Sequence, residues 1–466
     1  MNDRPRRTFT GSGPRTAPTP ATAPGGRAGP APRPGGAPVR LGLLAATFVA
    51  MLALTMLGPM MTITGADLTG AGNWQRQAGY VAITVLTMVA LRPLHDWRRL
   101  LTVPLPIALA LAWCLLSIAW SIAPGVGFRR LLLTAMVIWS VFAAVRWLGY
   151  ERTVNLTRWV LLVSLVLSYI VVFAYPELGI HQADEVYDKK LIGDWRGIFM
   201  HKNTAGAICA FAVLMFAFDR GRMPRWLQIG AVALAVGFLV MTTSRTSLGV
   251  CAGAAVLGAL FTFYHARYRL FLIGTIIVAL LIGSIYINIY NAPFSSVLDD
   301  RTAFTGRTLI WDALIRYTID NPLGSGFGSF WNIGSASPIF QYARGWVITV
   351  TEGHNGFLDL AATIGIPGLI LVVALVVVWP LVRLLGSEAA SGQRGAMLLA
   401  VMVFCIAHNG TESSLMDRDT ILQVMLMLTI ALIWSVTRAP LRRTPARPAF
   451  AADAPRKPRT FGVEQA

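Results

Sequence analysis

The chain has 466 residues, of which 55% are hydrophobic and only 13% are charged, and its formal net charge is +18. This charged fraction is about half that of ordinary soluble domains, so the composition excludes a soluble globular protein and predicts an all-α integral membrane protein. The basic excess could indicate a nucleic-acid partner or membrane topology, and the positions of the basic residues separate these two interpretations.

The first 40 residues form the first predicted segment. They contain nine Pro, seven Gly and seven Arg, with almost nothing apolar before Val39. Such a composition cannot bury enough apolar surface to fold, so we predict a disordered tail over 1–40. The next run, 41–61, is long, apolar and without a small-x-small cleavage site, and we interpret it as a retained membrane span rather than a signal peptide.

Twelve apolar segments with the character of membrane spans follow one another along the chain. They are 41–61, 78–91, 102–122, 131–148, 159–175, 204–218, 226–243, 247–264, 270–290, 367–384, 396–408 and 420–436. Together they predict a transmembrane domain over 41–436, followed by a second tail over 437–466. The four cysteines all fall within spans and form no CxxC pair, so we expect buried thiols rather than disulfides or metal ligands.

The distribution of Lys and Arg gives the expected orientation, because basic residues are retained on the cytoplasmic face. With the N-terminus inside, 27 of the 40 basic residues and 7 of the 22 acidic residues lie on the inner side. We therefore predict that both termini are cytoplasmic. Since the basic excess follows the membrane topology, we exclude nucleic acid as a partner.

Two long segments are expected on the outer side. The smaller, 176–203, concentrates histidine and charged residues, and the larger, 291–366, is too long to be a simple connection. Within the larger segment, TLIWDALIRY at 308–317 places apolar residues on one helical stripe and sets Asp312 one turn from Arg316. This pattern predicts an amphipathic helix outside the membrane.

Three arginines on the outer side are candidate anion ligands. Arg245 follows Ser244, a good helix N-cap, so it either binds an anion at the depth of lipid phosphates or marks the boundary of the next span. Arg307 falls in the first turn of the amphipathic helix, where a positive charge opposes the helix dipole by roughly 0.3 to 1 kcal/mol. We therefore expect a compensating negative group, either Asp299 or Asp300 or a bound phosphate, and Arg301 has the same two interpretations.

His354 lies just before an apolar run, in EGHNGFLDLAATIGIPG at 352–368. Asn355 is a suitable N-cap for a helix that begins there, and the positive end of that helix would favour a neutral imidazole. A neutral imidazole can act as a general base. The alternative is a hydrogen-bonded residue at the membrane interface.

Five motifs together resemble the bacterial O-antigen ligase and polysaccharide polymerase family. In chain order they are WRGIFMHKNTAG (195–206), TTSRTSLG (242–249), TGRTLIWDALI (305–315), NPLGSGFGSFW (321–331) and EGHNGFLDLAATIGIPG (352–368). The FxHKNxxG form is similar to the exopolysaccharide-polymerase branch. The resemblance implies a metal-independent, cofactor-free GT-C-type glycosyltransferase whose donor is a glycan on undecaprenyl pyrophosphate at the periplasmic face of the bacterial inner membrane.

The resemblance also implies roles for particular residues. His354 would be the base that activates the acceptor, and Arg245 and Arg307 would hold the pyrophosphate. Further candidates for the pyrophosphate are Arg301, Arg196 and Lys202, while Glu352 would orient the imidazole and Glu412 would contact glycan. The implied partners are the lipid-linked donor, a glycan acceptor and the bilayer, together with chain-length regulators and export proteins.

Three further patterns resemble known kinds of site or motif, but we do not interpret them as functional sites. The glycines of LGSGFGSF at 323–330 lack the GK[ST] of a phosphate-binding loop, and the Asp299–Asp300 pair lacks a third metal ligand at a fixed spacing. His408-Asn409-Gly410 repeats the letters of His354-Asn355-Gly356 in different flanks, and we interpret it as coincidence.

Two other classes of protein would have the same general topology. A lipid-linked oligosaccharide flippase would show internal repeats and charges at mid-membrane, and the sequence shows neither. A scaffold subunit would not need the histidine and the arginines. We therefore predict polymerisation of exopolysaccharide or O-antigen repeat units, with O-antigen ligation to lipid A core as the first alternative and glycosylation of a protein hydroxyl as the second.

Overall fold

The computed structural model describes residues 38–57, 72–183, 191–219, 221, 223–268, 271, 306–418 and 420–438. Throughout these ranges the chain is helical or irregular, apart from an isolated bridge between Ile180 and Trp195. The predicted all-α class is therefore confirmed for the described residues. Nearly all of the two predicted tails and of the predicted span 270–290 lies outside them, as do Arg301, Asp299 and Asp300.

Within the described ranges, eleven of the twelve expected spans coincide with helices. These are α1 (Leu41–Leu57), α2 (Trp74–Leu91), α3 (Leu105–Leu116), α4 (Pro124–Leu148), α5 (Tyr150–Ala174), α7 (Lys202–Ala217), α8 (Arg225–Met241), α9 (Arg245–Phe261), α14 (Gly356–Val372) with α15 (Trp379–Leu385), α16 (Gly392–His408) and α17 (Ile421–Arg438). Helices α4, α5 and α17 and the continuous stretch Gly356–Leu385 are long and apolar enough to cross a membrane, and six others are apolar but shorter. A polytopic membrane protein is supported, and the total of about twelve spans stays a prediction.

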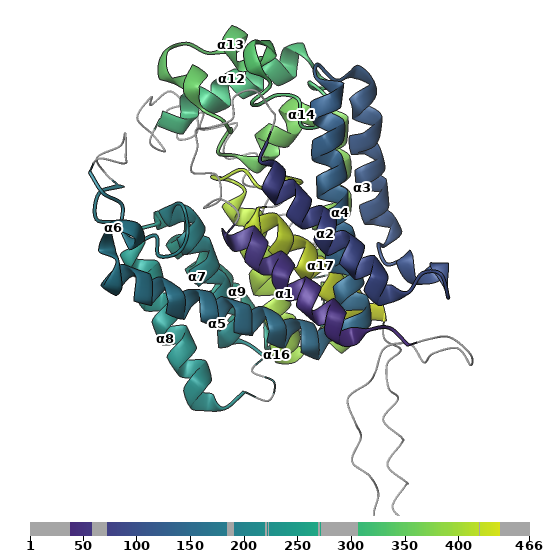
Figure 1. The fold of residues 1–466 in the computed structure, drawn as a ribbon, viewed down its shortest axis with the longest axis vertical. Helices are drawn as coiled ribbons and strands as arrows, with labels where there is room; N and C mark the ends of the chain where they lie inside the picture. The colour runs from purple at the N-terminus through teal and green to yellow at the C-terminus, as the bar shows by residue number, and fades with distance from the viewer. Residues whose placement is uncertain are drawn as a thin grey trace, which may run out of the picture.

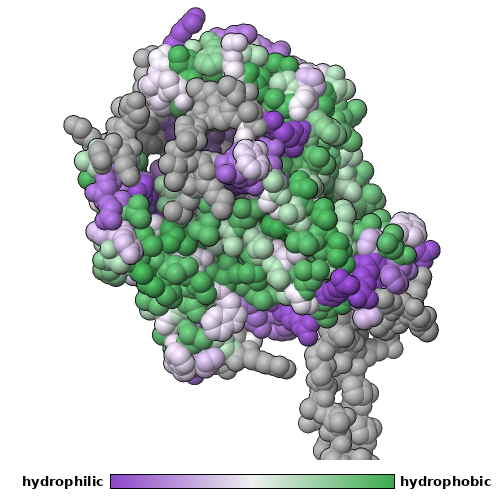
Figure 2. Space-filling model, in the orientation of Figure 1, coloured by the Kyte–Doolittle hydropathy of each residue, from purple (hydrophilic) through white to green (hydrophobic). Residues whose placement is uncertain are grey.

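Large apolar side chains are exposed along the helix bundle, among them those of Val85, Leu109, Phe173 and Leu260. Figure 2 shows that hydrophobic residues form a broad band across the bundle, with hydrophilic residues above and below it. Leaving so much apolar surface in water would cost about 25 cal/mol for each Å². The band is therefore the surface that faces lipid.

The described chain begins and ends at the same end of the bundle. The backbone N–H of Arg40 donates to the carbonyl of Ala90 (3.0 Å), and Arg438 shares a small cavity with Thr102 and Arg146. Helices α12 (Arg307–Asp320) and α13 (Ile339–Tyr342) lie at the opposite end (Figure 1). This arrangement agrees with two termini on one side of the membrane, and which side is cytoplasmic stays a prediction.

The predicted amphipathic helix is α12, which extends over Arg307–Asp320. Its apolar stripe, with Ile310 and Leu314, packs into a core of its own with Phe330 and Val347. On its exposed face Arg316 Nη2 lies 2.6 Å from Asp312 Oδ2, as the sequence predicts. Helix α12 therefore forms part of a folded cap at one end of the bundle, and its place outside the membrane stays a prediction.

Helix α14 begins before the apolar run of the tenth predicted span, which starts at 367. It begins at Gly356, as the Asn355 cap predicts, and is broken at Gly365, where φ is 77° and ψ is 173°. The glycine-rich turn of 321–328 fills this break: the Ile366 N–H donates to Pro322 O (2.9 Å), and a Cβ on Gly324 would lie 2.6 Å from Thr363 O. These glycines permit close packing of the turn on α14, which accounts for a pattern that resembles a phosphate-binding loop.

Candidate active site

His354 lies in a tight turn between Gly353 and Asn355, the residue that caps α14. Its φ is 49°, a left-handed conformation that costs a residue with a side chain about 1 to 3 kcal/mol. The preceding residue is held on both sides, because the Gly353 N–H donates to Asp359 Oδ2 (2.9 Å) and its carbonyl accepts from Trp311 Nε1 (3.0 Å). The extramembrane helix α12 and the first turn of α14 thus hold the histidine in this strained position.

The other side of the turn is held by the loop that joins α16 to α17. Asn355 caps α14 as expected, with its side-chain oxygen accepting from the Phe357 and Leu358 N–H groups at 3.1 Å. The Asn355 N–H donates to Ser413 Oγ (3.0 Å), and the Gly356 N–H donates to Asn409 O (2.8 Å). A Cβ on Gly356 would lie 2.2 Å from Asn409 Oδ1, so the close approach of these loops requires glycine.

The second His-Asn-Gly sequence is part of this contact. Asn409 accepts from the first turn, as does Gly410, whose carbonyl takes a hydrogen bond from Asn355 Nδ2 (3.2 Å). His408 is buried and its Nε2 lies 3.2 Å from Ser247 Oγ. The two sequences therefore pack against each other, although they have different roles.

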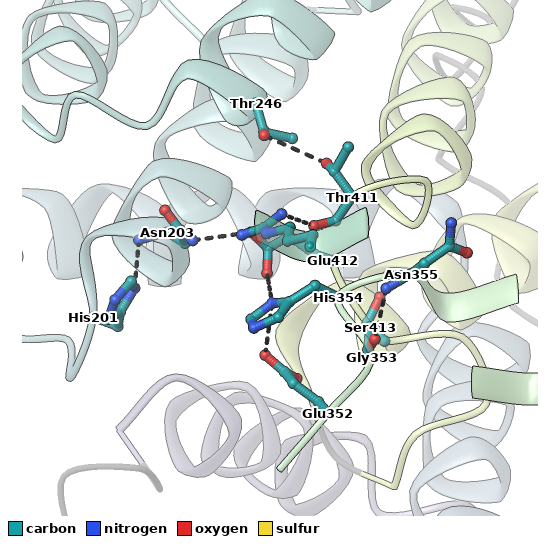
Figure 3. Close-up of polar contacts among 12 residues, drawn as sticks. His201, Asn203, Thr246, Glu352, Gly353, His354, Asn355, Thr411, Glu412 and Ser413 are labelled. Carbon is teal, nitrogen blue, oxygen red and sulfur yellow. Dashed lines mark hydrogen bonds and ion pairs between the residues drawn. The ribbon is translucent and has the colours of Figure 1, made fainter. Parts of the chain in front are cut away.

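Two carboxylates meet the imidazole of His354 at the same nitrogen (Figure 3). Glu412 Oε2 and Glu352 Oε1 each lie 3.3 Å from His354 Nδ1. Burial opposes ionisation of Glu412, but the hydrogen bond to His354 and the charge of Arg307 lower the pKa of this carboxyl to about 2. Since an ionised carboxylate can only accept, Nδ1 carries the hydrogen and Nε2 is the basic nitrogen.

The protonation state of His354 differs from the sequence-based expectation. Burial lowers the pKa of the imidazole, but the hydrogen bond to Glu412 and the charge of Glu352 outweigh it, so the net shift is upward. The two carboxylates thus make this imidazole more basic than the helix end alone would, and the local sequence does not bring them together. In the described part of the chain, every hydrogen bond and ion pair of this ring is made by Nδ1, which leaves Nε2 available to a substrate.

Arg307 is joined to the same group. Its Nη2 lies 2.9 Å from Glu412 Oε1, and its Nη1 donates to the carbonyl of Thr411. Within the described residues Glu412 supplies a compensating negative charge for this arginine, and Asp299 and Asp300 lie outside them. Glu412 lies between Arg307 and His354, where it can orient the imidazole, and its predicted contact with glycan stays a prediction.

Asn203 completes the surroundings of Glu412, and no local pattern in the sequence marks it. Its Nδ2 donates to Glu412 Oε1 (2.9 Å). The neighbouring His201 caps α7 by accepting from the Asn203 N–H at its Nδ1 (3.1 Å), and burial lowers the pKa of this imidazole, which favours the neutral accepting form. The HKN motif contains both residues, but charge patterns draw attention to its lysine instead.

The other predicted cations lie in different settings. Arg245 is exposed at the first turn of α9, and its side chain makes no hydrogen bond or ion pair with the described residues. The next residue, Thr246, accepts from the hydroxyl of Thr411, the neighbour of Glu412 (3.4 Å). Lys202 is paired with Asp194 (2.6 Å), and Arg196 donates to the Leu178 carbonyl (2.9 Å). Pyrophosphate binding by these cations stays a prediction.

Three side chains of the site have the donor atoms for a metal ion. Ligand atoms of Glu352, His354 and Glu412 all lie within 4.8 Å of one another. Arg307 already places a positive charge on Glu412, and a cation at Nδ1 would have to displace the hydrogen that this nitrogen donates. The geometry is thus better suited to a carboxylate–histidine pair, and metal independence stays a prediction.

Comparison with protein families gives one match. Residues 229–373 match the model of the O-antigen ligase family. A search of curated proteins found no match to the chain. The protein therefore contains an O-antigen ligase family domain, and this family comprises membrane enzymes that ligate or polymerise lipid-linked glycans. The matched segment includes Arg245, Arg307 and His354, whereas Asn203 and Glu412 lie outside it.

Proposed function

We propose that this protein transfers a glycan from undecaprenyl pyrophosphate to a hydroxyl of another glycan at the periplasmic face, and so polymerises repeat units of an exopolysaccharide or O-antigen. The observation that carries the proposal is the ordered group Arg307–Glu412–His354, in which one carboxylate binds both an arginine and the imidazole nitrogen opposite the basic one. It supports a base and a phosphate ligand acting side by side.

The proposed reaction needs a base for the acceptor hydroxyl and positive charge near the leaving pyrophosphate. The acceptor oxygen bonds to the anomeric carbon while the bond from that carbon to the pyrophosphate oxygen breaks, and His354 Nε2 takes the hydroxyl proton. Glu412 holds the imidazole and stabilises the imidazolium that forms. The departing lipid pyrophosphate carries the negative charge, and the exposed guanidinium of Arg245, together with Arg307, would stabilise it.

Ligation to lipid A core is the second candidate, and the description of the matched family favours it. Both reactions have the same donor and differ only in the acceptor. Deletion of the gene separates them: loss of long chains with accumulation of single repeat units indicates a polymerase, and long unattached lipid-linked chains indicate a ligase. Donor that remains on the cytoplasmic leaflet would instead indicate a flippase and refute the proposal.

The role of His354 is tested with a His354→Ala variant in membranes that contain lipid-linked donor. We expect transfer to be lost, while the variant is inserted normally and the donor persists. The matched control is Asp312→Asn, which removes a charge from an exposed surface pair of α12. Polymer of normal length from the His354→Ala variant would show that the base is another group.

A further inference from the structure

The small cavity that Arg438 shares with Thr102 and Arg146 lies at the end of the bundle opposite to α12 (Figure 1), away from the proposed reaction. It is enclosed by the last turns of α4 and α17 and by the turn that leads into α3. Its volume, about 50 Å³, is far below the range of about 300 to 1,000 Å³ for small-molecule sites. The cavity therefore has room for one small chemical group rather than for a whole ligand.

A buried hydroxyl in the wall of this cavity lacks a hydrogen-bond partner. Thr102 is only 6% exposed, and its Oγ1 makes no hydrogen bond with any described residue. Buried polar atoms normally have a partner, because losing contact with water without one is costly. Since Thr102 lines the cavity, a ligand with acceptor oxygens there would receive its hydrogen, and Ser435 adds a second hydroxyl to the lining.

Two arginines supply positive charge to the same cavity. Arg146 and Arg438 line it, and neither forms an ion pair or hydrogen bond with another described residue. No carboxylate is among the described residues of the lining. The guanidinium carbons of Arg438 and Arg383 lie 4.3 Å and 4.6 Å from the centre of the Trp434 ring. Several like charges are thus held close together, and a bound anion would offset their repulsion.

The positions of the two lining arginines also have a cause that involves no ligand. Arg146 and Arg438 each lie in the last turn of a helix, where a positive charge interacts favourably with the helix dipole. This effect does not explain why the hydroxyl of Thr102 is buried without a partner in the same cavity. Guanidinium and hydroxyl donors around one small space are the groups that bind a phosphate.

Tryptophan side chains indicate the depth of the cavity in the membrane. Trp434 lines it, Trp379 lies 5.3 Å from Trp434 between ring centres, and Trp147 directly follows Arg146. Tryptophan is enriched at the level of the lipid headgroups, and basic pockets between membrane helices bind anionic headgroups. We propose that this cavity binds the phosphate of an anionic phospholipid from the leaflet at this end of the bundle.

The test measures lipid binding to the full-length protein, purified in an uncharged detergent. Short-chain phosphatidylglycerol is titrated, and native mass spectrometry gives its Kd. We expect Arg146→Gln, Arg438→Gln and Thr102→Val each to raise this Kd about fivefold or more, because each removes a donor to the phosphate. The matched control is Arg98→Gln, which removes an exposed arginine that lies four residues before Thr102 and does not line the cavity. Its Kd should stay within about twofold of that of the unsubstituted protein.

Thermal unfolding separates lost binding from lost folding. Valine resembles threonine in shape and lacks the unpartnered hydroxyl, so lipid-free Thr102→Val should unfold at the same temperature as the unsubstituted protein or at a higher one. If all three cavity variants bind phosphatidylglycerol as tightly as the unsubstituted protein, or if that protein binds none, the cavity is not a lipid-phosphate site. This test needs no transfer activity, so its outcome is independent of the proposed function.

Two further probes identify the source of the phosphate. Inorganic phosphate and short-chain phosphatidylcholine are titrated in the same way, and we expect both to bind more weakly than phosphatidylglycerol. If inorganic phosphate binds as tightly, the ligand is a soluble phosphate and the assignment to lipid is overturned. If phosphatidylcholine, which has no net charge, binds as tightly, the cavity does not select an anionic lipid.

Discussion

Replacing Glu412 with Gln tests whether this carboxylate makes His354 a base. The substitution keeps the shape of the side chain but removes the charge that accepts from Nδ1 at 3.3 Å and pairs with Arg307 at 2.9 Å. An amide nitrogen facing Nδ1 would favour the wrong tautomer, with the hydrogen on Nε2. Because a positioned base contributes about 10² to 10⁴ in rate, we expect kcat to fall by about that factor.

The pH dependence gives a second measure of the same substitution. Glu412 and Glu352 together raise the pKa of His354, so activity that needs the free base should fall as the pH drops through that raised value. Without the Glu412 charge, burial and Arg307 act on the imidazole with less opposition and the pKa falls. The acidic limb of the kcat profile should therefore move to lower pH in Glu412→Gln.

The assay is transfer from saturating lipid-linked donor, measured between about pH 5.5 and 9. Asp312→Asn again serves as the control for loss of one surface charge. If the Glu412→Gln enzyme keeps kcat within about twofold and shows the same acidic limb, Glu412 does not make His354 a base. Thermal unfolding of both variants distinguishes a lost base from a lost fold.

The remaining predictions concern the arginines, the glycine contact and the metal. Arg307→Lys and Arg245→Lys should each slow turnover about tenfold or more in transfer assays, because lysine lacks the planar pair of N–H donors with which a guanidinium binds phosphate. Unchanged kinetics for both variants would show that neither arginine has a role in turnover. Gly356→Ala places a Cβ 2.2 Å from Asn409 Oδ1 and should cost about 1 to 3 kcal/mol in unfolding measurements, whereas Gly253→Ala, with open space around it, should not destabilise. Removal of divalent cations with EDTA should leave transfer unchanged, and loss that Mg²⁺ restores would contradict metal independence.

Local patterns in the sequence predict the local structure of the site well. The stripe of 308–317 predicts α12, and Asn355 predicts the start of α14, because capping and amphipathic periodicity depend on residues within one or two helical turns. The apolar run starts later than the helix because the first turns of α14 carry polar residues such as Asp359, whose partner Trp331 comes from another segment. Hydropathy cannot register a polar turn that is satisfied by tertiary contacts.

The chemical setting of His354 depends on contacts that no local pattern contains. Glu412 is 58 positions from His354 along the chain, and Asn203 is 209 positions from Glu412. The sequence could name Glu412 only as a candidate for glycan contact, since nothing in its neighbours shows that the loop between α16 and α17 lies on the histidine turn. The upward pKa shift of His354 follows from that same packing.

The loop between α16 and α17 has a consequence for the extent of the catalytic unit. The segment that matches the O-antigen ligase family ends at residue 373 and contains His354, Arg245 and Arg307. A histidine with a φ of 49° needs outside contacts to hold it, and three of these come from 409–413: the Asn409 carbonyl, the Ser413 hydroxyl and the Glu412 carboxylate. Without α16 and α17 the base would lose its position and its charge partner, so the unit that can carry out the proposed transfer must extend through α17.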